Sequence, residues 1–168
     1  MKTRWYVPVL LCACLLLCGC GNSRERQAYA AICNAYDGEA SWTLNGRDYA
    51  GHISIGKRDE TGERGAVIVY TSPAALCGMT VRAEGQDALL SLGNVTHRLT
   101  GEAAEEALAI VCLFSPKVAE EAVWTKEGLV HTEQDSTYTA RFDDEGRICE
   151  LGFSSPARTI SLRPGGGA

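Results

Sequence analysis

The sequence predicts an α+β fold, in which short antiparallel strands are interrupted by one strongly apolar helix. Between Ser41 and Leu162, segments that alternate apolar and polar residues recur and are separated by turn residues such as Gly93-Asn94. Because the connections are short, neighbouring segments should pair as an antiparallel meander. Residues 101–114 instead carry apolar side chains around most of a helical circumference, which indicates a buried helix. A chain of 168 residues suits a single domain of this kind.

A short amphipathic N-terminal helix is predicted before the first strand. Four residues share one helical face: Tyr29, Ile32, Cys33 and Tyr36. Ser23 is a candidate N-cap, and Asp37-Gly38 is expected to end the helix. The period then changes to two, and we predict one long strand from Ser41 to Ile55 with a bulge near Asn45-Gly46.

Further strands are predicted over residues 65–71, 79–83, 88–92 and 95–99. The apolar helix follows; three acids in its first turns suit a helix N-terminus, and Ser115-Pro116 stops it. A second helical piece is expected over residues 117–123. The last strands are predicted over residues 124–126, 129–133, 136–142, 147–154 and 158–162, with an acidic hairpin turn at residues 143–146.

The first residues resemble the export signal of a bacterial lipoprotein. Lys2 and Arg4 form a positive start, and the apolar run of residues 7–17 has the length of a signal peptide rather than of a membrane-spanning helix. The run ends in Leu17-Cys18-Gly19-Cys20, which resembles the lipobox motif. By this resemblance, diacylglycerol is attached to Cys20 and a peptidase cleaves after Gly19. An ordinary secretory signal and an uncleaved anchor are the alternatives.

The chain is therefore expected to comprise a signal peptide (1–19), a lipidated anchor (20–23), a single α+β domain (24–163) and a frayed tail (164–168). Since two or three acyl chains hold a protein stably at a bilayer, we expect it on the extracytoplasmic face of the cell membrane, or at the outer membrane if the organism has one. The net charge of −5 becomes more negative when Lys2 and Arg4 leave. Acids and bases alternate at residues 57–60 and at Glu63-Arg64, which indicates a solvated surface and argues against nucleic-acid binding.

The order of elements resembles the lipoprotein-carrier group with its LolA/LppX-like domains. The stretches that carry the resemblance are Gly65–Pro73, Leu76–Gly93 and Tyr138–Ile148. Small lipoproteins of Gram-positive anaerobes are especially similar in layout. The resemblance implies a strongly curved antiparallel sheet, a half-barrel, wrapped around a central apolar helix with an apolar cavity between them. No residue matches the cavity arginine of the chaperone in this group, so its activity is not carried over.

Four cysteines remain after the signal and the anchor: Cys33, Cys77, Cys112 and Cys149. An even number in an oxidising compartment allows disulfides, with Cys33–Cys112 as the candidate pair if the helices adjoin. Each cysteine also stands where a small apolar residue belongs, so buried free thiols are the favoured interpretation. Since the chain that follows the signal and anchor contains no C-x-x-C or C-x-x-H spacing, a metal site is not expected.

No catalytic constellation is evident, so no enzyme activity, catalytic residue or cofactor apart from the lipid on Cys20 is predicted. Three histidines lie on separate predicted strands and are interpreted as surface residues: His52, His97 and His131. Three acidic clusters are interpreted as solvated faces and a hairpin tip: Glu105-Glu106, Glu120-Glu121 and Asp143-Asp144-Glu145. Ser41, Ser72 and Ser91 do not stand in a G-x-S-x-G motif, and no glycine-rich phosphate loop follows a strand.

Seven aromatic residues supply large apolar side chains: Trp42, Tyr49, Tyr70, Trp124, Tyr138, Phe142 and Phe153. Core packing is their simplest role, but in a half-barrel some should line the cavity. The leading hypothesis is a membrane-anchored, non-enzymatic binding module that shelters an acyl chain, a lipid or a lipoprotein segment. The alternative is an envelope protein-interaction or sensor lipoprotein with a filled core. The two differ in whether the helix of residues 107–114 fills the inner face of the sheet.

Overall fold

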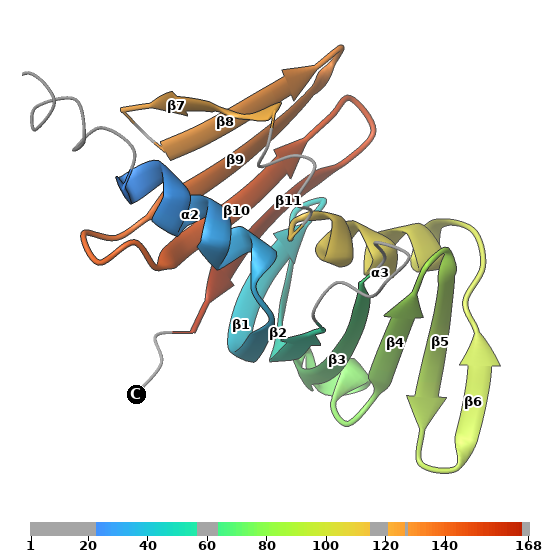
Figure 1. Cartoon of the computed structure of the whole chain (residues 1–168). Helices are drawn as coiled ribbons and strands as arrows, with labels where there is room; N and C mark the ends of the chain where they lie inside the picture. The colour runs from blue at the N-terminus through green and yellow to red at the C-terminus, as the bar shows by residue number, and fades with distance from the viewer. Residues whose placement is uncertain (1–22, 57–63, 115–120, 127, 166–168) are drawn as a thin grey trace, which may run out of the picture.

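The computed structural model describes residues 23–56, 64–114, 121–126 and 128–165, which build one eleven-stranded antiparallel sheet with helices packed on it (Figure 1). The helices are α2 (Ser23–Cys33), α3 (Glu102–Cys112) and the 3₁₀ turn η1 (Ala74–Leu76). The strands are β1 (Tyr36–Leu44), β2 (Arg47–Ile55), β3 (Gly65–Ser72), β4 (Thr80–Glu84), β5 (Asp87–Leu92), β6 (Val95–Arg98), β7 (Val123–Thr125), β8 (Gly128–Glu133), β9 (Ser136–Phe142), β10 (Ile148–Ser154) and β11 (Thr159–Pro164).

The first and last strands of the chain meet in the middle of the sheet. The strand order is β6-β5-β4-β3-β2-β1-β11-β10-β9-β8-β7, so two meanders are joined by the pairing of β1 with β11. In this pairing Trp42 lies opposite Leu162. Strands β6 and β7 form the two edges. The antiparallel meander predicted from the short connections is confirmed.

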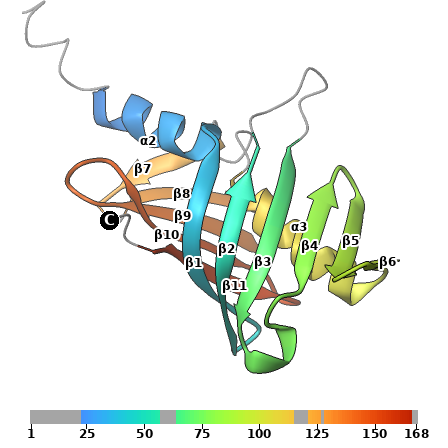
Figure 2. The ribbon, with the colours of Figure 1, turned by 90° about the horizontal axis from the view of Figure 1, so that it is seen from below.

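The sheet is strongly curved and does not close, and α3 lies within the curve (Figures 1 and 2). Helix α3 contacts β4 and β5, whereas α2 contacts β10 in the other half of the sheet. This is the α+β half-barrel with a central apolar helix and a short N-terminal helix that the sequence predicted. In the part of the chain that the structure describes, no helix is long and apolar enough to cross a membrane.

The core lies between the inner face of the sheet and the helices. Alternate residues of β1 and β2 are buried, as the period-two pattern predicted. Helix α2 adds Ala28 and Ile32 to the core, and the segment that follows α3 adds Leu113 and Phe114. Removing these apolar side chains from water supplies the main stabilising free energy of the fold.

Residues 41–55 form two strands rather than the single long strand that we predicted. Asn45 and Gly46 have φ of 49° and 78°, and Leu44 pairs with Arg47 across them. Two successive residues in the left-handed region make a tight hairpin turn, and Asn-Gly is the sequence that best accepts this geometry. The bulge expected at Asn45-Gly46 was therefore wrong, because the chain reverses there.

The first helix is shorter than predicted, since α2 ends at Cys33 and Tyr36 already begins β1. Asp37 and Gly38, which we expected to end the helix, pair with Ser54 and Ile53 of β2. The hydrogen bonds of this long ladder outweigh the weak helical preference that the spacing of Tyr36 indicated.

The end of the domain also differs from the predicted boundary. Strand β11 continues to Pro164, which lies opposite Ala40, and the N–H of Gly165 donates to the carbonyl of Glu39 at 2.6 Å. The strand thus includes the first residue of the expected frayed tail. The signal segment with Cys20 and most of the helical piece predicted over residues 117–123 lie outside the described residues.

Candidate ligand-binding cleft

Helix α3 fills only one part of the inner face of the sheet. Its residues Ala104, Ala107 and Ile110 are buried, and on this side it packs on β4 and β5. The facing strands carry the small, fully buried residues Ala83 and Ala88. Small side chains allow a helix to approach its neighbour closely. On this side the core is filled, as the alternative hypothesis required.

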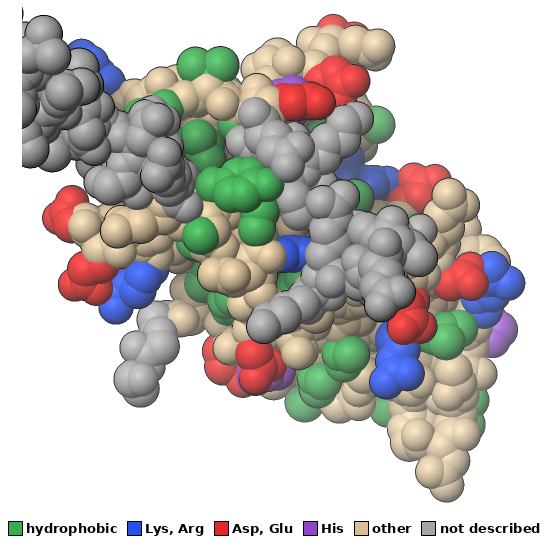
Figure 3. Space-filling view, viewed as in Figure 1, with side chains coloured by type: hydrophobic (Ala, Val, Ile, Leu, Met, Phe, Trp, Pro, Cys, Tyr) green, Lys and Arg blue, Asp and Glu red, His purple; other side chains and the backbone are tan. Residues whose placement is uncertain are grey.

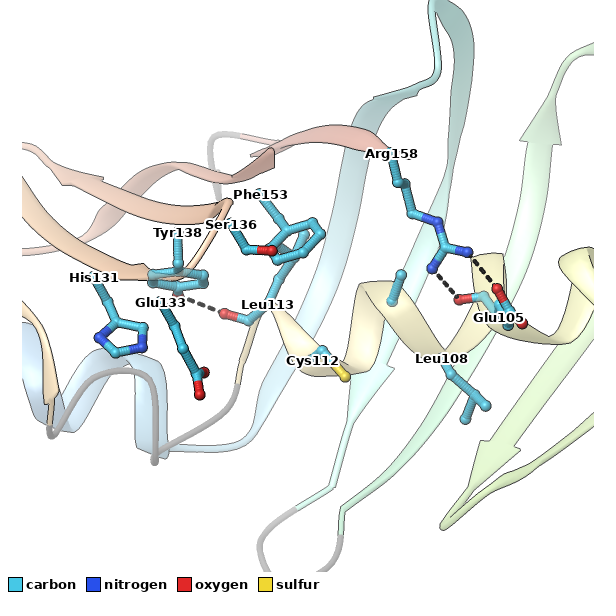
Figure 4. Close-up of a pocket in the computed structure, with 11 residues that line it drawn as sticks. Glu105, Leu108, Cys112, Leu113, His131, Glu133, Ser136, Tyr138, Phe153 and Arg158 are labelled. Atoms are coloured by element: carbon cyan, nitrogen blue, oxygen red, sulfur yellow. Dashed lines mark hydrogen bonds and ion pairs between the residues drawn. The ribbon is translucent and has the colours of Figure 1, made fainter. Parts of the chain in front are cut away.

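On its other side, α3 borders an open cleft of ≈ 380 Å³, which we call the α3 cleft (Figure 4). It lies between the helix and strands β8, β9 and β10. Its lining consists of Glu105, Leu108, Ala109, Cys112, Leu113, His131, Glu133, Ser136, Tyr138, Phe153 and Arg158. The volume falls within the range of about 300–1,000 Å³ that is typical of small-ligand sites. The predicted apolar cavity is therefore present beside the helix.

Tyr138 on β9 forms a hydrogen bond with the end of α3. Its side chain is 4% exposed, and its hydroxyl donates to the carbonyl oxygen of Leu113 at 2.5 Å. Carbonyls in the last turn of a helix lack partners within the helix, so this bond satisfies one of them. Burial raises the pKa of Tyr138 above its usual 10.0. Tyr138 and Phe153 are the two predicted aromatic residues that line the cleft.

Arg158 closes one end of the cleft by binding the first half of α3. Its guanidinium lies 2.8 Å from the Glu105 carboxylate and donates to the Glu105 main-chain carbonyl at 3.2 Å. The Arg158 side chain is only 21% exposed. A cation held at two points in this way is well ordered, because each contact limits the other. Sequence analysis did not single out Arg158, since its acidic partner lies 53 residues away in the chain.

His131 and Glu133 lie at the opposite end of the cleft, on β8 (Figure 4). His131 Nε2 is 3.6 Å from the Glu121 carboxylate, and its Nδ1 is 3.4 Å from the Glu121 carbonyl oxygen. Glu133 is exposed and makes no ion pair with the described residues. The middle of the cleft is thus apolar, and charged side chains line both of its ends.

Arg64 joins the C-terminal ends of both helices. Its guanidinium donates to the carbonyls of Ile32 at 3.0 Å and of Phe114 at 2.8 Å, and it also contacts the carbonyl of Cys33. A cation is favoured at a helix C-terminus by both the orphan carbonyls and the helix dipole. The prediction that Glu63-Arg64 belongs to a solvated surface was wrong for Arg64, which is 8% exposed.

The cysteines are free thiols in the described part of the chain, and most are not buried as we expected. Cys77, Cys112 and Cys149 are exposed, and Cys33 is half-buried, so the Cys33–Cys112 disulfide is absent. Cys112 lines the α3 cleft, Cys149 lies on β10, and Cys77 lies in the turn after η1. Desolvation raises the pKa of the Cys112 thiol, although the nearby Arg158 charge acts in the opposite direction.

The three histidines lie on different strands, as predicted: β2, β6 and β8. His52 Nε2 is 2.9 Å from the Asp37 carboxylate, and this bond raises the pKa of His52. In the hairpin at residues 143–146, the N–H groups of Glu145 and Arg147 donate to the Asp143 carboxylate, which explains that acidic tip. The described residues contain no group of three or more His, Cys, Asp or Glu that could hold a metal ion.

Three of the remaining aromatic residues form a separate cluster on β1, β2 and β3. Trp42 lies 5.9 Å from Tyr49 and 5.5 Å from Tyr70 between ring centres. Burial, with a smaller contribution from Tyr49, raises the pKa of Tyr70 to about 12. On the other half of the sheet, Trp124 stacks on Phe142. These residues pack against the core rather than line the cleft. The candidate serines lie apart on three different strands.

Charged side chains do not gather in one basic patch on the face shown in Figure 3, where acidic and basic groups are interspersed. No protein-family model and no curated protein matches the chain. Solved structures are similar to it at low sequence identity. A LolA-superfamily protein from Nitrosomonas europaea gives a TM-score of 0.41 at 10% identity, over 84% of this chain and 90% of that chain.

Two further solved structures have comparable similarity. The lipoprotein LppX of Mycobacterium tuberculosis gives a TM-score of 0.42 at 11% identity, over 85% of this chain and 92% of LppX. MucB gives a TM-score of 0.45 at 13% identity, over 88% of this chain and 58% of MucB, so the chain spans little more than half of that protein. These similarities concern the fold alone.

Proposed function

We propose that this chain is a membrane-anchored, non-enzymatic binding module that shelters an acyl chain, a lipid or a lipoprotein segment in the α3 cleft. The observation that carries the proposal is the open cleft beside α3, ≈ 380 Å³ in volume. Its walls are apolar in the middle, where Leu108, Leu113 and Phe153 contribute. Apolar pockets with a few polar groups at the rim are the usual form of small-ligand sites.

Anchoring on the extracytoplasmic face of a membrane is the second part of the proposal. The sequence Leu17-Cys18-Gly19-Cys20 after a short apolar run supports it. Growth of an expressing bacterium with labelled palmitate tests it directly. Label should enter the wild-type chain and the Cys149→Ala control, and should not enter the Cys20→Ala variant. Equal labelling of the Cys20→Ala variant would contradict lipidation at this residue.

Ligand binding is tested by native mass spectrometry with solvent extraction of residues 21–168, which contain every described element. We expect an apolar species to co-purify and to be released by organic solvent. Ala109→Phe places an aromatic ring in the cleft and should prevent co-purification. Ala75→Phe makes the same change at an exposed position of η1 and is the matched control.

The result can also refute the proposal. A clean unliganded mass, together with no uptake of a fluorescent amphiphile, would exclude the carrier function. Binding that is unchanged in Ala109→Phe would place the ligand elsewhere. A co-purifying peptide would favour a protein segment as the occupant of this cleft. MucB, one of the similar structures, is known in complex with MucA.

A further inference from the structure

We infer that the α3 cleft selects amphiphiles that combine a single apolar chain with a positively charged head. The inference rests on the proposed function of this cleft and adds the chemical class of its ligand. It is argued from the charges at the two ends of the cleft and from the apolar wall between them, all of which are seen in Figure 4.

The middle of the cleft offers an apolar wall along α3. Leu108 and Cys112 lie one turn apart on the helix, Ala109 lies next to Leu108, and Phe153 lines the cleft from β10. A chain that follows this wall is removed from water along its length, which is the main source of its binding free energy. A volume of ≈ 380 Å³ lies near the lower limit for ligand sites, so one chain fits better than several.

The end of the cleft at Arg158 is electrically neutral. The guanidinium is 2.8 Å from the Glu105 carboxylate and also donates to the Glu105 carbonyl. An anionic head would have to compete with this carboxylate for Arg158, and the displaced Glu105 would then repel it. Among the described residues that line the cleft, Arg158 is the only arginine, and it is therefore not available to a fatty-acid carboxylate.

The end of the cleft at β8 is acidic. Glu133 lines the cleft and makes no ion pair with the described residues. The neighbouring His131 also lines the cleft, and behind it the carboxylate of Glu121, which is not part of the lining, lies 3.6 Å from the imidazole. The total charge of Glu133, Glu121 and His131 is negative whether the imidazole is neutral or protonated. A positive head placed here is attracted, and a negative head is repelled.

These two ends define an orientation for the ligand. The positive head lies beside Glu133, and the apolar chain runs along α3 toward Leu108 and the neutral Arg158–Glu105 pair. The net charge of −5 for the whole chain adds to the attraction of cations at long range.

Protection of the Cys112 thiol provides the test, because this residue lines the cleft and Cys149 serves as an exposed reference on β10. The full chain is reconstituted in phosphatidylcholine vesicles and treated with a membrane-impermeant thiol reagent. Octylammonium, octanoate and octanol are added in turn, and modification of each cysteine is measured by mass spectrometry. We expect octylammonium to protect Cys112 at a concentration about five- to tenfold lower than octanoate.

The variant Glu133→Gln should reduce this preference to about twofold, and Glu133→Lys should reverse it. Glu84→Gln, the same change at an exposed position of β4, should leave it unchanged. Partition into the vesicles is equal for all variants, so their comparison isolates the cleft. An equal effect of all three amphiphiles would overturn the charge preference and leave the proposed function intact. Failure of all three amphiphiles, octanol included, and of an acetylated trileucyl-lysine amide would refute the proposed function itself.

A further measurement with a peptide distinguishes a small cationic amphiphile from a polypeptide segment as the ligand. An acetylated trileucyl-lysine amide carries an apolar segment and one positive charge, as a membrane protein segment would. Protection of Cys112 by octylammonium supports the inference as stated. Protection by the peptide in the absence of any effect of octylammonium would overturn it in favour of a polypeptide ligand.

Discussion

The two halves of the curved sheet use the same helix in opposite ways. In the half formed by β1–β6, α3 packs on β4 and β5 against small, fully buried residues such as Ala83 and Ala88. In the half formed by β7–β11, the facing residues are Tyr138 and Phe153, and a cleft of ≈ 380 Å³ separates them from the helix. The comparison teaches that one apolar helix can fill part of a half-barrel and still leave a binding site.

The contacts that position α3 also differ between the halves. On the filled side, the buried alanine and isoleucine side chains of α3 pack directly on the sheet. On the cleft side, polar contacts reach main-chain carbonyls of the helix and its end: Arg158 to Glu105 and Tyr138 to Leu113. Such directional contacts hold the helix without requiring side chains to fill the gap, so the cleft stays open.

The largest expected effect comes from breaking the junction of the two helices at Arg64. Arg64→Ala removes the donor for the carbonyls of Ile32 and Phe114, which then remain buried without it. We expect the free energy of unfolding in urea to fall by about 3–5 kcal/mol. Arg64→Lys should recover part of this loss, because the positive charge at the helix ends is kept.

Arg82→Ala is the matched control for this change, since Arg82 is exposed on β4. It should alter the free energy of unfolding by less than about 0.5 kcal/mol. A loss below about 1 kcal/mol in Arg64→Ala would contradict a stabilising role for the buried guanidinium.

A second test compares the two sides of α3 with one substitution. Ala107→Phe adds a ring on the filled side, where Ala107 is 2% exposed, and overpacking should cost about 1–3 kcal/mol or more of unfolding free energy. Ala109→Phe adds the same ring on the cleft side, and we expect a change within about 0.5 kcal/mol because space is available. Equal losses in urea unfolding would show that the two sides are packed alike.

Most of this fold could be predicted from the sequence, because period-two and helical patterns report burial directly. The failures have specific physical causes. Asn45-Gly46 lies within an apparently continuous alternating pattern, and only the left-handed φ of both residues shows that the chain reverses. Tyr36 satisfies the helical spacing, but pairing of β1 with β2 takes precedence.

The sequence predicted that an apolar cavity exists, but not which polar contacts form its ends. The resemblance implied an apolar cavity, and Tyr138 and Phe153 were among the aromatic candidates. The polar contacts were out of reach, because Arg158 and Glu105 are 53 residues apart and no sequence pattern joins them. Arg64 follows an acid in a charged stretch, so its local sequence indicates exposure, whereas its burial depends on two helix ends that meet only in the folded chain.

Tyr138→Phe should lower the free energy of unfolding by less than Arg64→Ala does. The buried carbonyl of Leu113 loses its donor, which should cost about 1–2 kcal/mol of unfolding free energy. The raised pKa of Tyr138 also predicts a pH dependence. Above a pH of about 10 the tyrosine of the unfolded chain ionises while the native one stays neutral, so stability falls as pH rises. Urea unfolding at about pH 8 and about pH 11 should show a smaller fall in the variant; an equal fall would contradict the role of Tyr138.

The smallest expected effect distinguishes the cleft wall from the outer surface of the same half. Burial raises the pKa of the Cys112 thiol, so at neutral pH a smaller fraction of it is the reactive thiolate than in an unperturbed cysteine. Cys149 is exposed on β10. Iodoacetamide should therefore modify Cys149 several-fold faster than Cys112, and the ratio should shrink as pH rises and a larger fraction of Cys112 becomes thiolate. Peptide mass spectrometry over a pH series measures both rates at once. A ratio that stays constant with pH would mean that access, rather than ionisation, limits Cys112, and the cleft would then be narrower than its open volume indicates.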